Sequence, residues 1–419
     1  MPAEAIPRVP LIRAFAALRP APARAAEVAA PPYDVLSSEE ARARAAGKPW
    51  SFLHVSKPEI DLPPGTDPYS PAVYAKGAEN LARMREAGVL VRDAAPSYYV
   101  YRFTLDDLVQ TGVAAVASIQ AYDANRVRKH ELTRPDKEDD RVRHMEALNA
   151  QTGPVLAAYP SAPALDALLA EIARGAPETD VVADGGVRHS IRPVRDAGSI
   201  ARIGALFDAM PAIYIADGHH RSAAASRVAS RRRERGGGAE ASHEWFLVVA
   251  FPHHELRILD YNRVVRDLGG MTRHELLAKL GAAFDVTASK GPVRPARHGE
   301  FGMYAGGHWH RFAPRPGLAD PVDPVARLDA SLLTSRVLSP LLGIGDLRTD
   351  KRIDFVGGGR GLGELEKRVD SGEMAAAFSL YPTRLEDLMA VADAGEVMPP
   401  KSTWFEPKLA DGLLSHVLD

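Results

Sequence analysis

The stretch Ile213-Tyr-Ile-Ala-Asp-Gly-His-His-Arg-Ser222 joins a short apolar run to a group of polar residues. The apolar run predicts a buried strand over 211–216, and the alanine-rich residues 222–233 predict a helix directly after it. A strand–turn–helix of this kind places backbone N–H groups and the positive end of the helix dipole at the turn. Gly218 permits a tight turn or the close approach of a ligand, because it has no Cβ atom. The stretch therefore predicts a site for an anion, and a phosphate is the best candidate.

The side chains of this turn suit phosphate chemistry. The planar guanidinium group of Arg221 matches phosphate oxygens, and the imidazoles of His219 and His220 can add N–H donors. Asp217 is expected to face a metal ion or a donor group of the substrate. In the alternative interpretation, the two histidines only cap the helix and Asp217 pairs with Arg221.

The composition limits the classes of function. A chain of 419 residues exceeds one ordinary core, so two domains are expected. The apolar fraction of 46% and the charged fraction of 25% are typical of a globular protein. The net charge of −2 favours neither nucleic acid nor a membrane surface as a partner.

The chain contains no cysteine, which excludes disulfides, thiolate zinc sites and cysteine nucleophiles. No apolar run is long enough for a signal sequence or a membrane span. A cytoplasmic protein is therefore expected.

Apolar patterning and turn residues predict the remaining elements. The expected strands cover 51–55, 98–104, 112–122, 155–159, 189–194, 245–251, 256–259, 301–305 and 308–312. The expected helices begin after Ser37 and cover 72–88, 163–174, 271–284, 326–338, 361–369 and 384–394. Because strands and helices are mixed without regular βαβ alternation, an α+β fold is expected rather than a doubly wound sheet.

The segment from Arg128 to His144 is the second candidate for chemistry. Arg128, His130 and Glu131 follow a predicted strand, and Pro135 separates them from a helix expected near Asp139. On that helix Asp140 and His144 are four residues apart and share a face. Carboxylates beside arginines and histidines are typical of a general base or a metal-bound acid, although they also occur on solvated faces with weak ion pairs.

Three other stretches carry weaker patterns. The glycine-rich segment from Gly357 to Gly363 matches neither a Walker loop nor a dinucleotide fingerprint, so a flexible loop is expected. His253-His254-Glu255 lacks a further spaced histidine, so a hairpin turn is expected rather than a metal site. The segment 401–405, Lys-Ser-Thr-Trp-Phe, is a candidate pocket wall, although aromatic residues at this spacing more often belong to a core.

Several motifs, in order along the chain, resemble one bacterial family. They are Pro31-Pro-Tyr-Asp-Val35, Arg128-x-His-Glu-x-Thr-Arg-Pro135 with Asp140-Arg-x-x-His144 and Gly153-Pro-Val155, Ala216-Asp-Gly-His-His-Arg221, Asp260-Tyr-Asn-Arg-Val-Val265 and Met398-Pro-Pro-Lys-Ser-Thr-Trp-Phe-x-Pro-Lys408. Together they span nearly the whole chain. On these motifs the chain is identified as a member of the family catalogued as domain of unknown function 1015.

This family is often described as serine-kinase-like. Its Asp-Gly-His-His-Arg turn is similar to that of free L-serine kinases in the ParB/sulfiredoxin superfamily, where the corresponding strand–turn–helix binds nucleotide phosphates. The resemblance implies a mixed-sheet ParB/sulfiredoxin-like catalytic region over 1–265 and an additional α+β domain over 266–419. It also implies roles for individual residues: catalysis by Glu131, Asp217 and His220; phosphate or nucleotide binding by Gly218, His219, His220, Arg221, Arg128 and His130; and metal binding by Asp217 and Glu131.

The leading hypothesis is phosphorylation of free L-serine by ATP or ADP with Mg²⁺, or the reverse reaction. Glu131 would accept or orient the hydroxyl proton, while Arg221 and the histidines neutralise the charge of the transferred group. Further candidates for the substrate pocket are Arg134, Asp140, Arg141, His144, Asn262, Arg263, Lys401, Ser402 and Thr403.

Two alternatives stay open at this level. One is a metal-dependent phosphoesterase with ligands Asp217, His219, His220, Asp140 and His144. The other is a non-catalytic nucleotide sensor. The sequence does not set the phosphate donor, the acceptor, the metal or the oligomeric state, for which a homodimer is one option.

Overall fold

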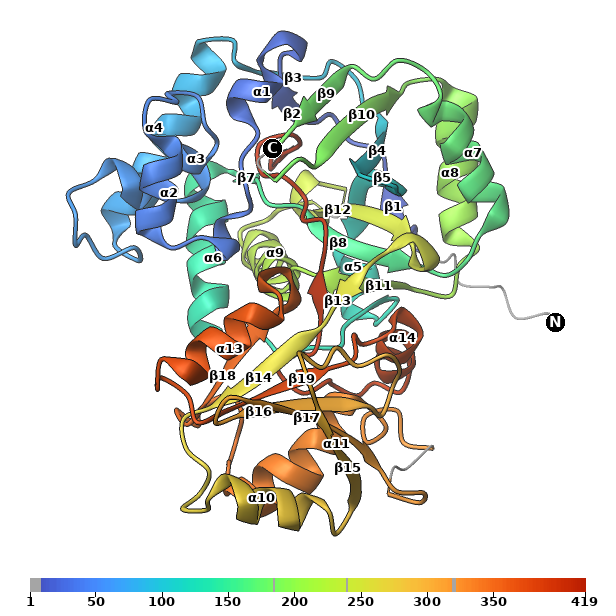
Figure 1. The fold of residues 1–419 in the computed structure, drawn as a ribbon. Coiled ribbons are helices and arrows are strands. Elements are labelled where there is room, and N and C mark those ends of the chain that lie inside the picture. The colour runs from blue at the N-terminus through green and yellow to red at the C-terminus, as the bar shows by residue number, and fades with distance from the viewer. Residues whose placement is uncertain (1–8, 184, 239, 319–321) are drawn as a thin grey trace, which may run out of the picture. The chain divides into compact units, whose positions relative to one another are not determined.

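The computed structural model describes residues 9–183, 185–238, 240–318 and 322–419 of the chain (Figure 1). The described residues form two compact units, of which the first lies within Met1–Leu256 and Pro407–Asp419 and the second within Arg257–Glu406. This division differs at two points from the expected boundary after Val265. The strand that contains Val265 pairs within the second unit, and the end of the chain returns to the first.

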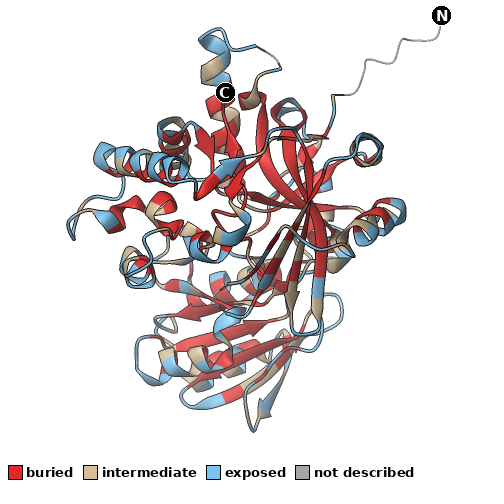
Figure 2. Ribbon diagram, turned by 90° about the horizontal axis from the view of Figure 1, so that it is seen from above, coloured by how far each residue is buried: buried red, intermediate tan, exposed pale blue. Residues whose placement is uncertain are grey.

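The first unit is built on a nine-stranded mixed sheet. Its strands, in spatial order, are β6 (Val127–Arg128), β11 (Ile213–Asp217), β8 (Val155–Tyr159), β12 (Trp245–Pro252), β5 (Leu108–Ser118), β4 (Tyr98–Leu105), β10 (Arg188–Val194) and β9 (Thr179–Val182), with β1 (Ile12–Arg13) paired to β5. The pairs β6–β11 and β8–β12 are parallel, and the other pairs are antiparallel. Figure 2 shows these strands buried along most of their length. The mixed sheet confirms the expected α+β class.

Helices cover this sheet and a smaller core beside it. They are α1 (Ala25–Val28), α2 (Ser38–Ala45), α3 (Leu53–Ser56), α4 (Pro71–Glu86), α5 (Ile119–Asp123), α6 (Pro135–Leu148), α7 (Pro163–Ala173), α8 (Ala197–Asp208) and α9 (His219–Glu234). Helices α7 and α8 lie side by side (Figure 1) and bury Leu165 and Phe207 in the core of the sheet. Helix α9 buries Ala225 and Val228 in the same core.

Among the described residues, three short two-stranded pairings lie outside the main sheets. They are β2 (Leu18–Pro20) with β3 (Leu90–Arg92), β7 (Ala150–Gln151) with β21 (His416–Val417), and, in the second unit, β13 (Ile258–Leu259) with β20 (Trp404–Phe405). The pairing of β21 with β7 anchors the last residues of the chain to the first unit.

The second unit contains an antiparallel six-stranded sheet. Its order is β15 (Phe284–Ser289), β17 (His308–Pro314), β16 (Phe301–Ala305), β19 (Ala376–Leu380), β14 (Tyr261–Val265) and β18 (Ile353–Gly357). The β16–β17 pair is the hairpin predicted across Gly306 and Gly307. The helices of this unit are α10 (Arg273–Leu280), α11 (Asp329–Leu333), α12 (Ser339–Leu342), α13 (Leu362–Asp370) and α14 (Leu385–Asp393).

Local chemistry explains several boundaries. Helix α2 begins with a capping box, in which the Ser37 hydroxyl accepts from the Glu40 N–H and the Glu40 carboxylate accepts from the Ser37 N–H. Strand β5 ends at Ser118 rather than at Tyr122, because the Ser118 hydroxyl caps α5 by accepting from the Ala121 N–H.

Other expected elements also differ from the structure. Residues 51–55 were expected as a strand, but Leu53–Ser56 form the short helix α3, whose apolar residues are buried against α4 and its neighbours. A short apolar run does not distinguish a buried strand from a buried helix turn, so this prediction was wrong. Helix α6 begins at Pro135 rather than near Asp139, with proline in the first turn, where its missing N–H costs nothing.

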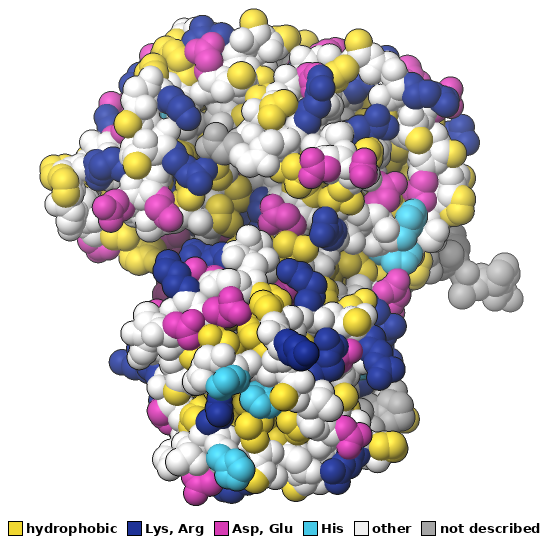
Figure 3. All heavy atoms as spheres, in the orientation of Figure 1, with side chains coloured by type: hydrophobic (Ala, Val, Ile, Leu, Met, Phe, Trp, Pro, Cys, Tyr) yellow, Lys and Arg dark blue, Asp and Glu magenta, His cyan; other side chains and the backbone are white. Residues whose placement is uncertain are grey.

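The surface carries charges of both signs. In Figure 3 basic and acidic side chains are interspersed over the visible face, in keeping with the net charge of −2. No helix among the described residues is long and apolar enough to cross a membrane.

Gly112 allows close packing within the main sheet, and its replacement tests this packing. A Cβ atom at Gly112 would lie 2.4 Å from the Ala250 carbonyl oxygen and 2.7 Å from a ring carbon of Phe251. Gly112→Ala is therefore expected to lower the free energy of unfolding by about 2 kcal/mol, as measured by urea denaturation. Gly238→Ala, where a Cβ atom would meet nothing within 4 Å, is the control. Equal stability of the two variants would contradict the packing described here.

Candidate functional site

The turn between β11 and α9 has the predicted strand–turn–helix form. Strand β11 ends at Asp217 and α9 starts at His219, three residues earlier than expected, so His219, His220 and Arg221 occupy its first turn. Gly218 has a φ of 100°, in the left-handed region that favours glycine. A Cβ atom at this position would also lie 3.0 Å from the Arg221 Nε atom. The glycine is therefore required both by the backbone and by the arginine beside it.

Arg221 is buried and bound to protein groups. Its Nη2 atom lies 3.7 Å from a carboxylate oxygen of Asp34 and 3.7 Å from one of Asp217, and Nη1 donates to the Pro154 carbonyl. Burial alone would lower the pKa of Arg221, but the carboxylates of Asp34 and Asp217 outweigh it and raise that pKa above its usual range. The geometry therefore contains the Asp217–Arg221 pair of the alternative interpretation, and Arg221 acts as a fixed cation that holds two carboxylates.

Asp217 has a second cationic partner. The Lys408 ammonium group donates to Asp217 Oδ2 at 3.1 Å. Burial would raise the pKa of Asp217, but Lys408 and then Arg221 hold it below its usual range. The carboxylate is therefore ionised, and two cations already compensate its charge.

The two histidines of the turn bind backbone N–H groups of the segment that follows β6. The His219 Nε2 atom accepts from the His130 N–H at 3.4 Å, and the His220 Nε2 atom accepts from the Arg134 N–H at 3.1 Å. A neutral imidazole that accepts at Nε2 carries its proton on Nδ1. The structure thus fixes the same tautomer for both rings and ties the start of α9 to residues 130–134.

Glu131 lies beside the buried face of this turn. One of its carboxylate oxygens is 3.7 Å from His219 Nδ1, and 41% of the Glu131 side chain is exposed. Burial, together with the neighbouring His130, lowers the pKa of His219 well below its usual range. Burial also lowers the pKa of His130 to about 4. Both rings are therefore neutral at physiological pH, and His219 presents an N–H toward the glutamate.

His130, Glu131 and His219 form a group whose potential ligand atoms all lie within 4.8 Å of one another. Asp217 is not part of this group. Asp217 and Glu131, the predicted metal ligands, do not suit Mg²⁺. The Asp217 carboxylate already pairs with Lys408 and Arg221, and Glu131 lies beside two imidazoles, whereas Mg²⁺ prefers oxygen ligands.

The chain matches the model of the family described as "Protein of unknown function (DUF1015)" over residues 12–331. It belongs to this family. No curated protein shows a significant match to the chain. The membership confirms the resemblance inferred from the sequence motifs.

Solved structures show distant similarity to this DUF1015 protein. A conserved hypothetical protein from Pyrococcus furiosus is 15% identical and has a TM-score of 0.35, covering 72% of this chain and 94% of its own. A free serine kinase in complex with AMP is 13% identical, with a TM-score of 0.35 and coverage of 70% and 86%. SbnI with a C-terminal truncation, from Staphylococcus aureus, is 11% identical, with a TM-score of 0.38 and coverage of 71% and 85%.

Three residues at the site had no predicted role. Lys408 pairs with Asp217, Asp34 faces Arg221, and Asp411 accepts from the Tyr33 N–H at 3.2 Å. Asp34 and Lys408 belong to motifs that carry the family resemblance, and this membership was the only signal in the sequence. Nothing in the spacing of the chain indicates that residues near 34, 217 and 411 meet.

Several predicted pocket residues instead have partners within the protein. Asp140 accepts from the Tyr74 hydroxyl at 2.9 Å and pairs with Arg141, whose guanidinium carbon lies 4.0 Å from the centre of the Tyr33 ring. His144 Nε2 lies 2.9 Å from the Val55 carbonyl oxygen. Asp140 and His144 therefore hold α6 to its neighbours, and the ligand set of the phosphoesterase hypothesis does not form one metal-binding group among the described residues.

The other predicted pocket residues lie in the second unit. Asn262 is fully buried and accepts from the Leu380 N–H at 3.0 Å, and the buried Arg263 donates to the carbonyl oxygens of Tyr261 and Pro400. The Ser402 hydroxyl donates to the Pro399 carbonyl at 2.7 Å. Lys401 lies over the Tyr261 ring at 5.9 Å, and Thr403 lies between Ser402 and β20. The described contacts of these residues are within their own unit.

Arg128 lies over the ring of Tyr214 at 5.8 Å, on the two parallel strands that end at the site. Because β6 pairs with β11 in parallel, the segment of His130 and Glu131 that follows β6 lies at the end of β11.

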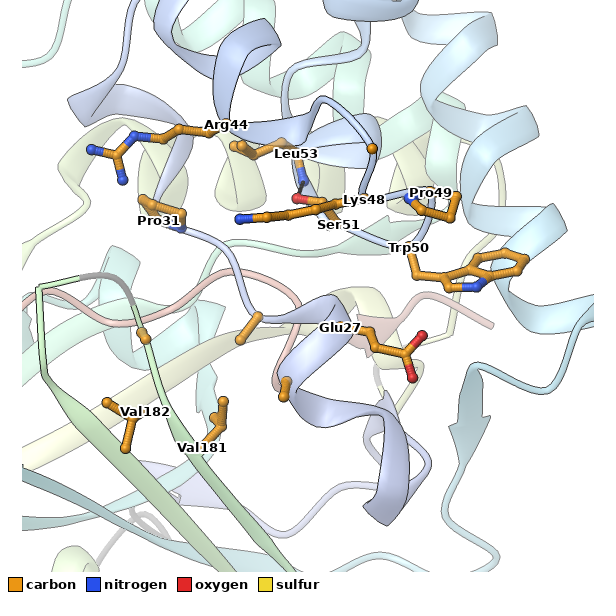
Figure 4. A pocket seen from close by; sticks show the side chains of 14 residues that line it. Glu27, Pro31, Arg44, Lys48, Pro49, Trp50, Ser51, Leu53, Val181 and Val182 are labelled. Carbon is orange, nitrogen blue, oxygen red and sulfur yellow. Dashed lines mark hydrogen bonds between the residues drawn. The ribbon is translucent and has the colours of Figure 1, made fainter.

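A separate cavity of about 420 Å³ lies elsewhere in the first unit, where Figure 4 shows Arg44, Lys48, Trp50, Val181 and Val182 around it. None of the predicted site residues lines this cavity.

Asp411 gives the site a testable dependence on pH. Its Oδ1 atom is buried without a hydrogen-bond partner among the described residues, and burial raises the pKa of Asp411 to about 7, although Arg221 opposes this. Between about pH 4 and pH 7 the folded protein therefore holds a proton that the unfolded chain has lost, so the contribution of Asp411 to stability falls as pH rises.

Asp411→Asn mimics the protonated carboxyl group and removes this titration. The free energy of unfolding of the variant, relative to the unmodified protein, is expected to rise by about 2 kcal/mol from pH 5 to pH 8. Urea denaturation at the two pH values measures it. Asp107→Asn, on an exposed turn, controls for the loss of one carboxylate. A constant difference between Asp411→Asn and the unmodified protein would show that Asp411 does not titrate in this range.

Proposed function

We propose that this protein transfers a phosphoryl group from ATP or ADP to the hydroxyl group of free L-serine, on a ParB/sulfiredoxin-like core in its first unit. The proposal is carried by one observation: the carboxylate of Glu131 lies 3.7 Å from His219 Nδ1, at the first residue of α9. A proton acceptor thus stands beside a helix N-terminus of the kind that binds phosphates. The similarity of the Asp-Gly-His-His-Arg turn to that of free L-serine kinases suggests L-serine as the acceptor of the phosphoryl group.

The phosphate groups are expected to bind at the start of α9. The first N–H groups of a helix have no partners within the helix and point toward a ligand at its end. His220, in the same turn, carries its ring proton on Nδ1 and is a further donor. The positive charges of Arg221 and Lys408 are balanced by the negative charges of Asp34 and Asp217. A bound phosphate would therefore interact with fixed dipoles rather than with an uncompensated positive cluster.

The transfer itself needs little covalent chemistry from the protein. The serine Oγ atom attacks the terminal phosphorus, the Oγ–P bond forms, and the bond from phosphorus to the bridging oxygen of the nucleotide breaks. The hydroxyl proton passes to Glu131, and the nucleotide leaves as ADP from ATP or as AMP from ADP. The His219 N–H orients the Glu131 carboxylate. Such reactions depend mainly on positioning and on neutralisation of charge.

Mg²⁺ accompanies nucleotides in most reactions of this kind, but its predicted ligands do not fit it here. Asp217 is compensated by Lys408 and Arg221, and Glu131 lies among imidazoles. We therefore assign no step to a protein-bound Mg²⁺.

Loss of the Glu131 carboxylate tests the proposal. The purified protein is incubated with L-serine and either ATP or ADP in Mg²⁺ buffer, and O-phosphoserine is measured by mass spectrometry. Glu131→Gln keeps the size of the side chain but cannot accept the proton, so turnover is expected to fall about 10²- to 10⁴-fold while nucleotide affinity, measured by calorimetry, is retained.

Glu146→Gln provides the matched control. Glu146, on α6, has a partly exposed carboxylate that pairs with Arg231 at 3.2 Å. Loss of this carboxylate is expected to leave turnover unchanged. Normal turnover by Glu131→Gln would show that Glu131 is not the proton acceptor. Nucleotide binding without O-phosphoserine formation by the unmodified protein would contradict the serine kinase assignment and favour a nucleotide sensor.

A further inference from the structure

We propose that His130, Glu131 and His219 form a binding site for a divalent transition metal ion of the Zn²⁺ or Co²⁺ type. The three residues come from two segments, the loop after β6 and the first position of α9. Their potential ligand atoms lie within 4.8 Å of one another. The site shares Glu131 with the proposed phosphotransfer, but metal binding by these residues does not require that activity.

The donor set determines the class of metal. Two imidazole nitrogens and one carboxylate oxygen match the ligands of zinc and cobalt centres, whereas Mg²⁺ prefers a shell of oxygens. Both imidazoles are buried. Neither ring nitrogen of His130 makes a hydrogen bond of ordinary geometry with a described group, and the ring packs edge-on against that of His219, with 4.4 Å between the ring centroids.

Metal binding requires the ligand atoms, which lie within 4.8 Å of one another, to come closer together. Metal–ligand bonds of about 2.1 Å place two ligands of a tetrahedral ion about 3.4 Å apart. His219 Nδ1 and the nearer oxygen of Glu131 are 3.7 Å apart, and the partly exposed Glu131 side chain has room to rotate. Binding at Nδ1 moves the ring proton of His219 to Nε2 and sacrifices its 3.4 Å hydrogen bond from the His130 N–H, which is already long.

A metal at this position has a defined chemical consequence. A divalent ion with one carboxylate and two neutral imidazoles carries a net charge of +1, and three protein ligands leave a coordination position open for water or an anion. Because a carboxylate bound to the ion is a poor acceptor for the serine proton, occupancy by Zn²⁺ is expected to inhibit the proposed phosphotransfer. This last expectation alone rests on the proposed function.

The metal itself is the probe. Tag-free, metal-free full-length protein is titrated with Co²⁺, and the visible absorption of the bound ion is followed, with Zn²⁺ added afterwards as a competitor. We expect one saturable Co²⁺ per chain, displaced by Zn²⁺ but not by millimolar Mg²⁺. His130→Ala and Glu131→Gln are each expected to weaken binding by about tenfold or more.

His254→Ala, on an exposed histidine of the same unit, is the matched control and is expected to bind Co²⁺ normally. Circular dichroism establishes whether His130→Ala is folded; if it is not, the partly exposed Glu131→Gln decides the test. Absence of saturable Co²⁺ binding, or binding unchanged in Glu131→Gln, would overturn the metal site. Formation of O-phosphoserine by the metal-free protein is measured in a separate assay. Failure of the metal site and failure of the proposed phosphotransfer are therefore distinguished from each other.

Discussion

The buried guanidinium group of Arg221 is the interaction on which the candidate site depends. It connects the short helical turn of Asp34, the carbonyl of Pro154 and the end of β11 at Asp217. A cation taken out of water costs several kcal/mol unless opposite charges and hydrogen bonds compensate it, and losing one partner of a buried pair typically costs about 3–5 kcal/mol. The segments that supply these partners are therefore held together by the requirement to neutralise one charge.

The same requirement explains the return of the chain to the first unit. Lys408 provides a second cation that compensates the carboxylates of Asp217 and Asp34, and Asp411 accepts a hydrogen bond from the backbone N–H of Tyr33. With two carboxylates already facing two cations, a third buried carboxylate has no full charge partner. This is the physical reason that the pKa of Asp411 rises to about 7 under the dominant effect of burial. Charge balance at the site thus couples the beginning, middle and end of the sequence.

The turn before α9 has two chemically different sides. One side is ionic and contains Asp217, Arg221 and Lys408, whose charges pair with each other. The other side contains the rings of His130 and His219 beside the carboxylate of Glu131, and neither ring nitrogen of His130 has a hydrogen-bond partner of ordinary geometry among the described residues. Groups that are fully paired stabilise a structure, whereas groups held in place with unused donor or acceptor capacity are available for a ligand. The side of His130, Glu131 and His219 is therefore where both proposals place chemistry.

The sequence alone determined the local features of this protein. The apolar run and the alanine-rich stretch around Gly218 predict β11 and α9 because hydrophobic periodicity and turn residues act over a few positions. The family motifs likewise identified the DUF1015 membership from short strings of residues. The run at 51–55 shows the limit of such reasoning, since burial on all sides erases the pattern that separates a strand from a helix.

Which polar residues meet depends on contacts between distant parts of the chain. Lys408 reaches Asp217 across 191 positions of sequence, and no local pattern encodes that contact. Asp140 and His144 share a helix face as predicted, yet that face packs inside the protein, so their partners are Tyr74, Arg141 and Val55. Spacing along a helix fixes which side chains are neighbours, but long-range packing fixes what they face.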